Sequence, residues 1–488
     1  TTGAANVAVG RNALGANTTA SNNVAVGHGA LESNTTGTSN VAVGYQALDA
    51  NTTADENTAV GYASLGANTT GASNTAMGQN ALLSNTTGAS NTSVGKSSLA
   101  SNTTADNNTA LGTSALGANT TGHENQAFGK DALVANTTGS GNIAVGYNAL
   151  AANTTGSDNL AIGCLALDAI SGGTSNVALG NYTLSANTTA TLNTALGYGA
   201  MQLNTTGSTQ VAVGASALRA NTTGAGNVAI GYLALDANTT GSDNTVIGTY
   251  ACDVSNAGNI TAVGRGALSA DTTGANNTAV GSNSGSAVTT GGDNTFIGAT
   301  AGDTCTTGSD NTCIGHNCDV QASDSGSRIG LGNDLTLTTN NTAYIGVGGN
   351  NVSTLFAGGS SWSWTSDERL KKNINTDTLG LEFINKLRPA TYELKPSQEV
   401  DPSLTEHYNA IEDKADSGKL KHGLIAQEVK AALDEVGVDT FGGWNDTSVD
   451  DVQRISPADF VYPLINAVKE LSSEVEELKS KAHEKCDK

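Results

Sequence analysis

A short motif that ends in glycine recurs every 17 residues through most of the 488-residue chain. It reads Asn, Val or Thr, Ala, an aliphatic residue and Gly, and its glycines keep the interval of 17 from Gly10 to Gly248. A strict short period predicts the stacked coils of a solenoid, because a unit of this size cannot bury a core alone. The interval then loosens, and 21 copies result if the later motif glycines are Gly264, Gly281, Gly298, Gly315, Gly330 and Gly346.

Residues 40–57 show how one coil is expected to fold. Val41-Ala42-Val43 predicts a short strand that Gly44 ends, Ala47-Leu48 is a second apolar point, and Asn51-Thr52-Thr53 predicts a polar turn. Stacking aligns equal positions, so leucines such as Leu48 form apolar columns and asparagines form hydrogen-bonded ladders. The predicted class is therefore mainly β, with a parallel β-solenoid or β-roll shaft over residues 1–350. At ~4.8 Å per coil the shaft is a rod of roughly 100 Å.

The charge distribution argues against two classes of partner. The net charge is −22, and residues 1–365 hold 6 Lys and Arg against 19 Asp and Glu. Nucleic acids and anionic membranes need clustered basic residues, so neither is an expected partner. The sequence shows no secretory signal and no apolar run of membrane-spanning length, so no membrane insertion is expected. The chain begins inside a repeat, which suggests that an N-terminal part is missing.

The cysteines are sparse and irregularly spaced, so they are predicted to be free thiols in small core positions. Cys313 and Cys318, with His316 between them, are a candidate metal site. Their spacing does not match a zinc motif and no fourth ligand is evident, so neither a metal nor a cofactor is expected. The cysteines are Cys164, Cys252, Cys305, Cys313, Cys318 and Cys486.

The shaft shows no paired carboxylates for glycan hydrolysis, which needs two acids at a defined separation. Its 13 Asn-Thr-Thr tripeptides match the glycosylation sequon, but their regular spacing indicates turns. The acids lie singly at variable turn positions, as the first of them show: Glu32, Asp49, Asp55, Glu56 and Asp106.

Residues 351–365 are predicted to be a neck between two domains. Alternation from Asn351 to Ala357 predicts a strand, and a Gly-Gly-Ser-Ser run follows it. Trp362 and Trp364 are expected to pack at the junction, although an exposed pair would also suit glycan stacking.

Residues 366–488 are more highly charged and predict a small α/β domain. Its expected parts are a helix at 378–387, a strand at 390–394, a charged insertion at 396–421, a strand at 423–425 and a helix that Gly437 stops after Val436.

The chain closes with a predicted coiled-coil helix at about 463–484. Pro463 suits its first turn, and apolar residues then recur with 4-3-4-3-4 spacing. The alternative is an amphipathic helix packed on its own domain. The residues of this seam are Leu464, Val468, Leu471, Val475, Leu478 and Ala482.

Four blocks in order, at residues 366–371, 387–394, 423–429 and 462–465, carry a family resemblance. The C-terminal part resembles the intramolecular chaperone domain that ends many phage tail spikes and tail fibres, the endosialidase-type self-cleaving endopeptidase, which also occurs in the myelin regulatory factors. The resemblance implies a homotrimer, with a trimeric coiled coil, in which the domain at 366–488 aligns three chains and then releases itself.

The same resemblance implies self-cleavage between Thr365 and Ser366 by a serine endopeptidase that acts only on its own chain. Ser366 is then the nucleophile on the Thr365 carbonyl, and Lys371 is the base. Taken alone, Ser366 followed by two acids reads as a helix cap and not as a nucleophile, and only the resemblance favours catalysis. His422, at the edge of a family block, is a candidate for assisting the reaction.

The shaft motif resembles the head repeats of trimeric autotransporter adhesins, which form a left-handed parallel β-roll of three chains from repeats that are usually shorter. Together the resemblances imply a homotrimeric phage tail fibre or tailspike protein, located in the virion and assembled in the bacterial host cytoplasm. Its expected partners are a host cell-surface receptor, either a glycan or an outer-membrane component, and other virion tail proteins. The alternatives are a bacterial trimeric surface adhesin and a glycan-degrading tailspike.

Overall fold

The computed structural model describes residues 2–321, 326–355, 363–364, 368, 372–402, 419–447 and 452–486. The chain divides into two compact units, Thr1–Thr365 and Ser366–Lys488. We call the first the shaft and the second the C-terminal unit.

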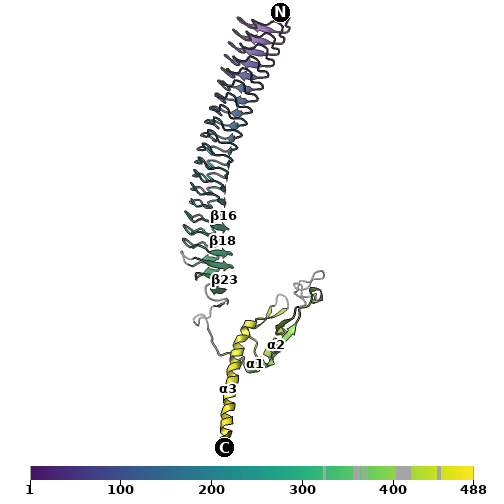
Figure 1. The fold of residues 1–488 in the computed structure, drawn as a ribbon, viewed down its shortest axis with the longest axis vertical. Helices are drawn as coiled ribbons and strands as arrows, with labels where there is room; N and C mark the ends of the chain where they lie inside the picture. The colour runs from purple at the N-terminus through teal and green to yellow at the C-terminus, as the bar shows by residue number, and fades with distance from the viewer. Residues whose placement is uncertain are drawn as a thin grey trace. The chain divides into compact units, whose positions relative to one another are not determined.

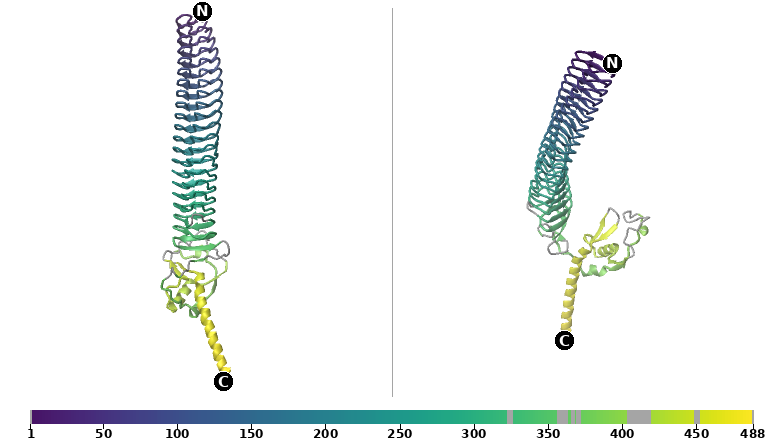
Figure 2. Two further views of the ribbon diagram at one scale, coloured as in Figure 1. Left: turned by 90° about the vertical axis from the view of Figure 1, so that its left-hand side faces the viewer. Right: turned by 45° about the horizontal axis from the view of Figure 1, so that its top comes forward.

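The shaft is a stack of coils, and each coil contributes one three-residue strand to a parallel sheet along one side of the stack (Figure 1 and Figure 2). Neighbouring strands pair in register, as in Val24↔Val41 and Ala25↔Ala42. The predicted parallel solenoid of 17-residue repeats is confirmed. Its strands are β1 (Val7–Val9), β2 (Val24–Val26), β3 (Val41–Val43), β4 (Thr58–Val60), β5 (Thr75–Met77), β6 (Thr92–Val94), β7 (Thr109–Leu111), β8 (Gln126–Phe128), β9 (Ile143–Val145), β10 (Leu160–Ile162), β11 (Val177–Leu179), β12 (Thr194–Leu196), β13 (Val211–Val213), β14 (Val228–Ile230), β15 (Thr245–Ile247), β16 (Thr261–Val263), β17 (Thr278–Val280), β18 (Thr295–Ile297) and β19 (Thr312–Ile314).

The parallel stack ends where the chain direction reverses. β21 (Arg328–Leu331) pairs with β19, and β23 (Thr342–Val347) pairs with β21, both in parallel. β24 (Asn350–Leu355) then runs antiparallel to β23, which confirms the strand predicted from Asn351 as far as the described residues reach. Phe356, Ala357 and Trp362 lie outside them. β25 (Ser363–Trp364) pairs antiparallel with β24, and β20 (Asp319–Val320) pairs with β22 (Thr336–Leu337).

The core of the shaft consists of small and aliphatic side chains that repeat in every coil. The middle strand residue, such as Ala25, is fully buried, while Val24 and Val26 on either side of it are partly exposed. Leu31 and its equivalents are also fully buried, although their backbone is left-handed, with φ of 54° at Leu31. A left-handed residue costs roughly 1–2 kcal/mol, and burial of a leucine contributes about 1.5–3 kcal/mol. The buried leucine column therefore offsets a strained turn in each coil.

Two ladders of buried asparagines run through the same core. Asn40 donates its backbone N–H to Asn23 Oδ1 at 2.9 Å and its Nδ2 to the Ala54 carbonyl at 2.9 Å. In the second ladder, Asn51 donates Nδ2 to Asn34 Oδ1 at 2.9 Å and to the Ala54 carbonyl at 3.1 Å. Buried amides are costly unless paired, and each coil supplies the partners for its neighbour. The ladders are confirmed, and the asparagine of the Asn-Thr-Thr tripeptides is a core residue.

The motif glycine cannot carry a side chain. Gly112 has a φ of +140°, and a Cβ there would lie 2.4 Å from the Gly129 carbonyl oxygen of the next coil. The prediction that Gly330 belongs to this column is wrong. Ile314 pairs with Leu331, so Gly332 follows Gly315 after another 17 residues. Gly330 instead faces the core, where a Cβ would lie 2.7 Å from Cys318 Sγ.

Asp271 stands where most coils place a ladder asparagine. It is fully buried, and this burial raises the pKa of its carboxyl to about 7, although the Gly274 N–H donates to Oδ1 at 2.8 Å. The folded chain therefore holds a proton that the unfolded chain, with an ordinary aspartate pKa near 3.8, has lost at neutral pH. The resulting penalty on stability is absent near pH 4 and grows as pH rises toward 7.

Asp271→Asn is expected to stabilise the shaft at pH 8 by up to about 4 kcal/mol, because the amide side chain does not ionise and restores the asparagine ladder. At pH 4 the gain should shrink to the value of the ladder contacts alone. The denaturant midpoints of wild type and variant at the two pH values measure this difference. Asp243→Asn, at an exposed turn position, is the control and should change stability by less than about 0.5 kcal/mol at either pH. An Asp271→Asn gain that is equal at both pH values would contradict the titration.

The C-terminal unit is a small α/β domain, as predicted. β27 lies two residues before the strand predicted at 423–425, because Tyr392 pairs with Lys421 and Ala390 with Gly423, while Ile425 caps α2. The first helix is shorter than predicted, and the β28–β29 hairpin was not predicted. The elements are α1 (Leu381–Lys386), β26 (Ala390–Tyr392), η2 (Ser397–Glu399), β27 (Lys421–Gly423), α2 (Ala426–Glu435), β28 (Trp444–Thr447), β29 (Val452–Ile455), η3 (Pro457–Phe460) and α3 (Val461–Cys486).

The core of this unit brings α1, α2 and η3 together. Phe383, Phe441 and Phe460 form an aromatic cluster with ring centroids 5.1–6.3 Å apart. Val429 and Leu433 of α2 are buried against it. Gly437, with a φ of 72°, ends the helix as predicted.

Candidate functional site

The residues predicted to catalyse self-cleavage fall in a part of the chain that the structure does not describe. Thr365, Ser366 and Lys371 all lie outside the described residues. Lys372, the next residue, is described and exposed. The Ser-Lys dyad therefore stays a prediction.

The described part of the family region forms one surface from blocks that are distant in sequence. Arg388 donates Nε and Nη2 to the two carboxylate oxygens of Glu428, at 3.1 and 2.5 Å, and this pair raises the pKa of Arg388. β26 and β27 also pair directly, with Ala390 opposite Gly423. The second and third resemblance blocks thus pack on each other.

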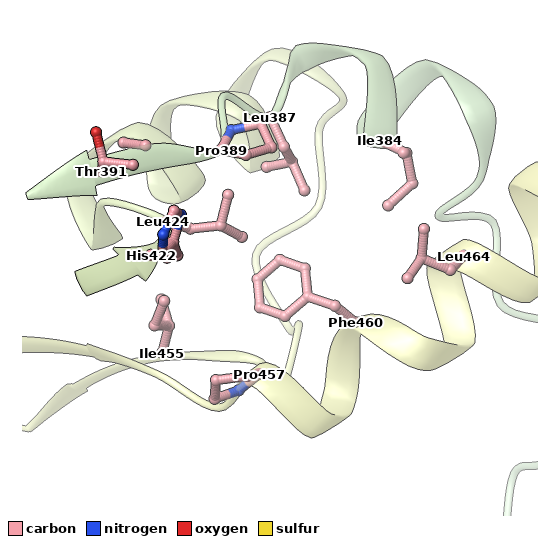
Figure 3. Close-up of a pocket in the computed structure, with 12 residues that line it drawn as sticks. Ile384, Leu387, Pro389, Thr391, His422, Leu424, Ile455, Pro457, Phe460 and Leu464 are labelled. Atoms are coloured by element: carbon pink, nitrogen blue, oxygen red, sulfur yellow. The ribbon is translucent and has the colours of Figure 1, made fainter. Parts of the chain in front are cut away.

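A cavity of about 640 Å³ lies beside these strands, lined mainly by apolar side chains (Figure 3). Ile384 and Leu387 line it from the α1 side, and Phe460 and Leu464 from the start of α3 (Figure 3). His422 lies on its β27 side, opposite Thr391 in the strand pair. The cavity is an apolar hollow beside the β26–β27 pair, and the suggested assistance of His422 in catalysis remains a prediction.

Helix α3 presents two different faces. On one, Asn466 donates Nδ2 to the Leu379 carbonyl at 3.0 Å, Glu470 Oε2 accepts the Leu381 N–H at 2.6 Å, and Ala467 is buried. The predicted seam lies on the other face and stays exposed, from 40% at Val475 to 65% at Leu478. The helix therefore packs on its own domain along its first turns and leaves the seam open. The seam residues are Leu464, Val468, Leu471, Val475 and Leu478.

Stacking brings shaft residues together that the sequence keeps apart. Asp303 and Asp319 of adjacent coils hydrogen-bond through their side chains, and burial together with Asp319 raises the pKa of Asp303. Two carboxyls in direct contact leave no room for a glycosidic bond between them, since hydrolases separate their pair by about 5 Å or more. This pair was missed because its members belong to different repeats.

An aromatic ladder was missed for the same reason. His28, Tyr45 and Tyr62 follow the motif glycines of three successive coils, and their rings stack with centroids 5.3 Å apart. Both faces of the Tyr45 ring are covered by its neighbours. A sugar ring needs an open aromatic face for stacking, so this ladder supports the coils and does not offer a glycan platform at Tyr45.

The candidate metal site has residues on opposite sides of the coil. Cys313 and Cys318 point into the core and are fully buried, whereas the side chain of His316 is 61% exposed, with Nδ1 3.7 Å from Asp334. The histidine and the two thiols therefore do not converge. Among the helices that the structure describes, none is long and apolar enough to cross a membrane.

Residues 366–438 match the family model described as "Chaperone of endosialidase". The match contains the first three resemblance blocks and ends before α3. No curated protein and no solved structure matches the chain. The C-terminal unit thus carries a domain of the chaperone-of-endosialidase family, and this domain together with the long parallel solenoid fits a phage tail fibre of the endosialidase type.

Proposed function

We propose that the chain is a homotrimeric phage tail fibre protein for host attachment, located in the virion. Its shaft reaches a cell-surface receptor, either a glycan or an outer-membrane component, and its other partners are virion tail proteins. The C-terminal unit aligns three chains and then cuts itself off. The exposed apolar stripe that runs along the shaft sheet carries this proposal, because it leaves a single chain incomplete.

This stripe comes from the strand residues that point away from the core. The strand residue before the motif glycine is apolar in most coils, and Met77, Leu111, Leu196, Ile247 and Ile345 at this position are each 38–48% exposed. Stacking joins them into one column, far longer than the scattered apolar residues of an ordinary monomer surface. Burial against two other chains removes this column from water. Other members are Val9, Ile162, Ile230, Ile297, Ile314 and Leu331.

The repeat also explains why such a shaft needs a chaperone. Successive strands pair with the same register, and the ladder asparagines make the same contacts in each coil. Three chains displaced by one coil keep nearly all of these contacts, so many incorrect alignments have almost equal energy. A folded trimeric domain at one end, built on the α3 seam and on unique surfaces such as the 640 Å³ cavity, selects one alignment.

The proposed cleavage makes this assembly step irreversible. Lys371 accepts the hydroxyl proton of Ser366, and Oγ attacks the Thr365 carbonyl. The Thr365–Ser366 peptide bond breaks when the Ser366 nitrogen takes the proton from Lys371 and leaves as an amine, and water then hydrolyses the ester between the Thr365 carbonyl carbon and Ser366 Oγ. After release, the shaft cannot return to its chaperoned state and is held by its unfolding barrier.

Two routes to the same shaft test the chaperone role. Residues 1–365 expressed alone are expected to aggregate or to give mixed oligomers, because nothing sets the alignment of the chains. The same residues released after assembly, through a specific protease site inserted after Thr365 of an uncleavable chain, are expected to remain trimeric. Mass photometry compares both with the full-length trimer, whose mass should be three times 48.7 kDa. A soluble, uniform trimer from the truncated gene would refute the chaperone role, and a monomeric full-length chain would refute the trimer.

A further inference from the structure

Two cysteines are in contact inside the shaft. Cys313 is the middle residue of β19, and Cys318 follows the motif glycine Gly315 by three residues. Both are fully buried, and their thiols hydrogen-bond to each other, which raises the pKa of Cys313 and lowers that of Cys318. We propose that Cys313 and Cys318 form a disulfide that joins β19 to the turn after it.

Another coil supports this geometry independently. The two equivalent positions there hold Ser93 and Ser98, whose Oγ atoms lie 2.5 Å apart. The strands of the stack pair in one common register, so the backbone repeats between the two coils. Side chains with one heavy atom beyond Cβ therefore meet at these positions. A disulfide requires the same close approach, with Cβ atoms about 3.5–4.5 Å apart.

The surrounding core is adapted to the two sulfurs. Equivalent positions in other coils hold alanines, such as Ala25 and Ala30, whose side chains are smaller than those of cysteines. Gly330 stands opposite Cys313 in the next strand, and a Cβ at this residue would lie 2.7 Å from Cys318 Sγ. The missing side chain at Gly330 thus makes room for the larger side chain at Cys318.

The oxidant that we propose is a low-molecular-weight disulfide. One cysteine thiolate attacks it, forms a mixed disulfide and releases one small thiol. The second cysteine attacks the mixed disulfide and releases the other, so two cysteine thiols and one small disulfide become one protein disulfide and two small thiols. Because both sulfurs are buried, the exchange takes place before the coil closes or while it is transiently open.

The position near the end of the parallel stack gives the disulfide a role. Among the strands that the structure describes beyond β19, only β21 and β23 continue the parallel sheet. End coils of a solenoid have fewer neighbours than middle coils and open first. A covalent link within this coil restricts its unfolded conformations and thereby slows opening from this end.

Peptide mapping tests the link directly on the full-length protein. The protein is incubated with oxidised glutathione or with dithiothreitol, its free thiols are alkylated in denaturant, and the chain is cut before aspartates. This releases residues 310–318, which contain Cys313 and Cys318, separately from residues 303–309 with Cys305. After oxidation, the 310–318 peptide is expected to be unalkylated and lighter than its reduced form by two hydrogen atoms. Alkylation of both cysteines, or a link to the 303–309 peptide, would overturn the proposal.

Unfolding rates test whether the disulfide slows the opening of the shaft. Oxidised wild type is expected to unfold at least about tenfold more slowly than reduced wild type in denaturant. The double variant Cys313→Ala/Cys318→Ala, which adopts the alanines of other coils, should unfold at one rate in both conditions. Cys252→Leu is the control, since neighbouring coils hold Leu235 and Leu268 at this position, and it should keep the difference. Equal rates for oxidised and reduced wild type would refute the link.

Discussion

Gly112→Ala is expected to destabilise the shaft by about 3 kcal/mol or more. The new Cβ would lie 2.4 Å from the carbonyl oxygen and 2.6 Å from the carbonyl carbon of Gly129 in the next coil. Neither atom belongs to a flexible side chain, so the two coils must separate. The residue would also keep a φ of +140°, which side chains rarely adopt. Separation breaks the strand pairing on which every later coil rests.

Gly117→Ala in the same coil is the matched control. A Cβ there would have the Ser114 carbonyl oxygen as its nearest neighbour, at 3.2 Å. The neighbouring coils already carry Ala100 and Val134 at this position. The substitution should be neutral or stabilise by about 0.4–1 kcal/mol, since it removes freedom from the unfolded chain. Unfolding rates of both variants at one denaturant concentration measure the contrast. A Gly112→Ala shaft as resistant as the Gly117→Ala shaft would contradict the backbone contact.

The shaft could be predicted closely because one coil is repeated many times. A strand at Val41–Val43, a break at Gly44 and a buried Leu48 are each weak signals alone, but the period of 17 repeats them in register. The error at Gly330 arose where the repeat loosens. A glycine that makes room in the core was there mistaken for the motif glycine, which the strand pairing shows to be Gly332.

The C-terminal unit contains no repeated motif, so a weak signal for one element is not reinforced by equivalent residues elsewhere. Its strand β27 was placed two residues late, since Leu424 and Ile425 are as apolar as strand residues but lead into α2. The ladder of His28, Tyr45 and Tyr62 was missed for a different reason, because contacts between coils become visible only when the stack is built. The prediction of a catalytic Ser-Lys dyad came from the family resemblance alone, and its residues lie outside those that the structure describes.

Ser366→Ala is expected to abolish self-cleavage completely while leaving a full-length trimer, because assembly precedes cutting in the proposed order. If Ser366 only capped a helix, the same change would lower stability by about 1 kcal/mol and would leave the covalent structure of the chain unchanged. If Ser366 is the nucleophile, mass spectrometry of freshly expressed wild type should show a C-terminal fragment that begins at Ser366 and contains about a quarter of the chain. In Ser366→Ala this fragment should be absent, and the intact 48.7 kDa chain should remain.

Lys371→Arg should block cleavage as well, since a guanidinium stays protonated at neutral pH and cannot accept the hydroxyl proton. Lys372→Arg keeps the same charge one residue later and should cleave like wild type, which makes it the control for the position of the base. Cleavage that persists in both Ser366→Ala and Lys371→Arg would exclude the dyad. A fragment that begins at another residue would move the site. A wild-type chain that stays intact after trimerising would separate the two proposed activities, because the proposed alignment uses the seam of α3, whereas the proposed cut uses Ser366, Lys371 and the carbonyl of Thr365.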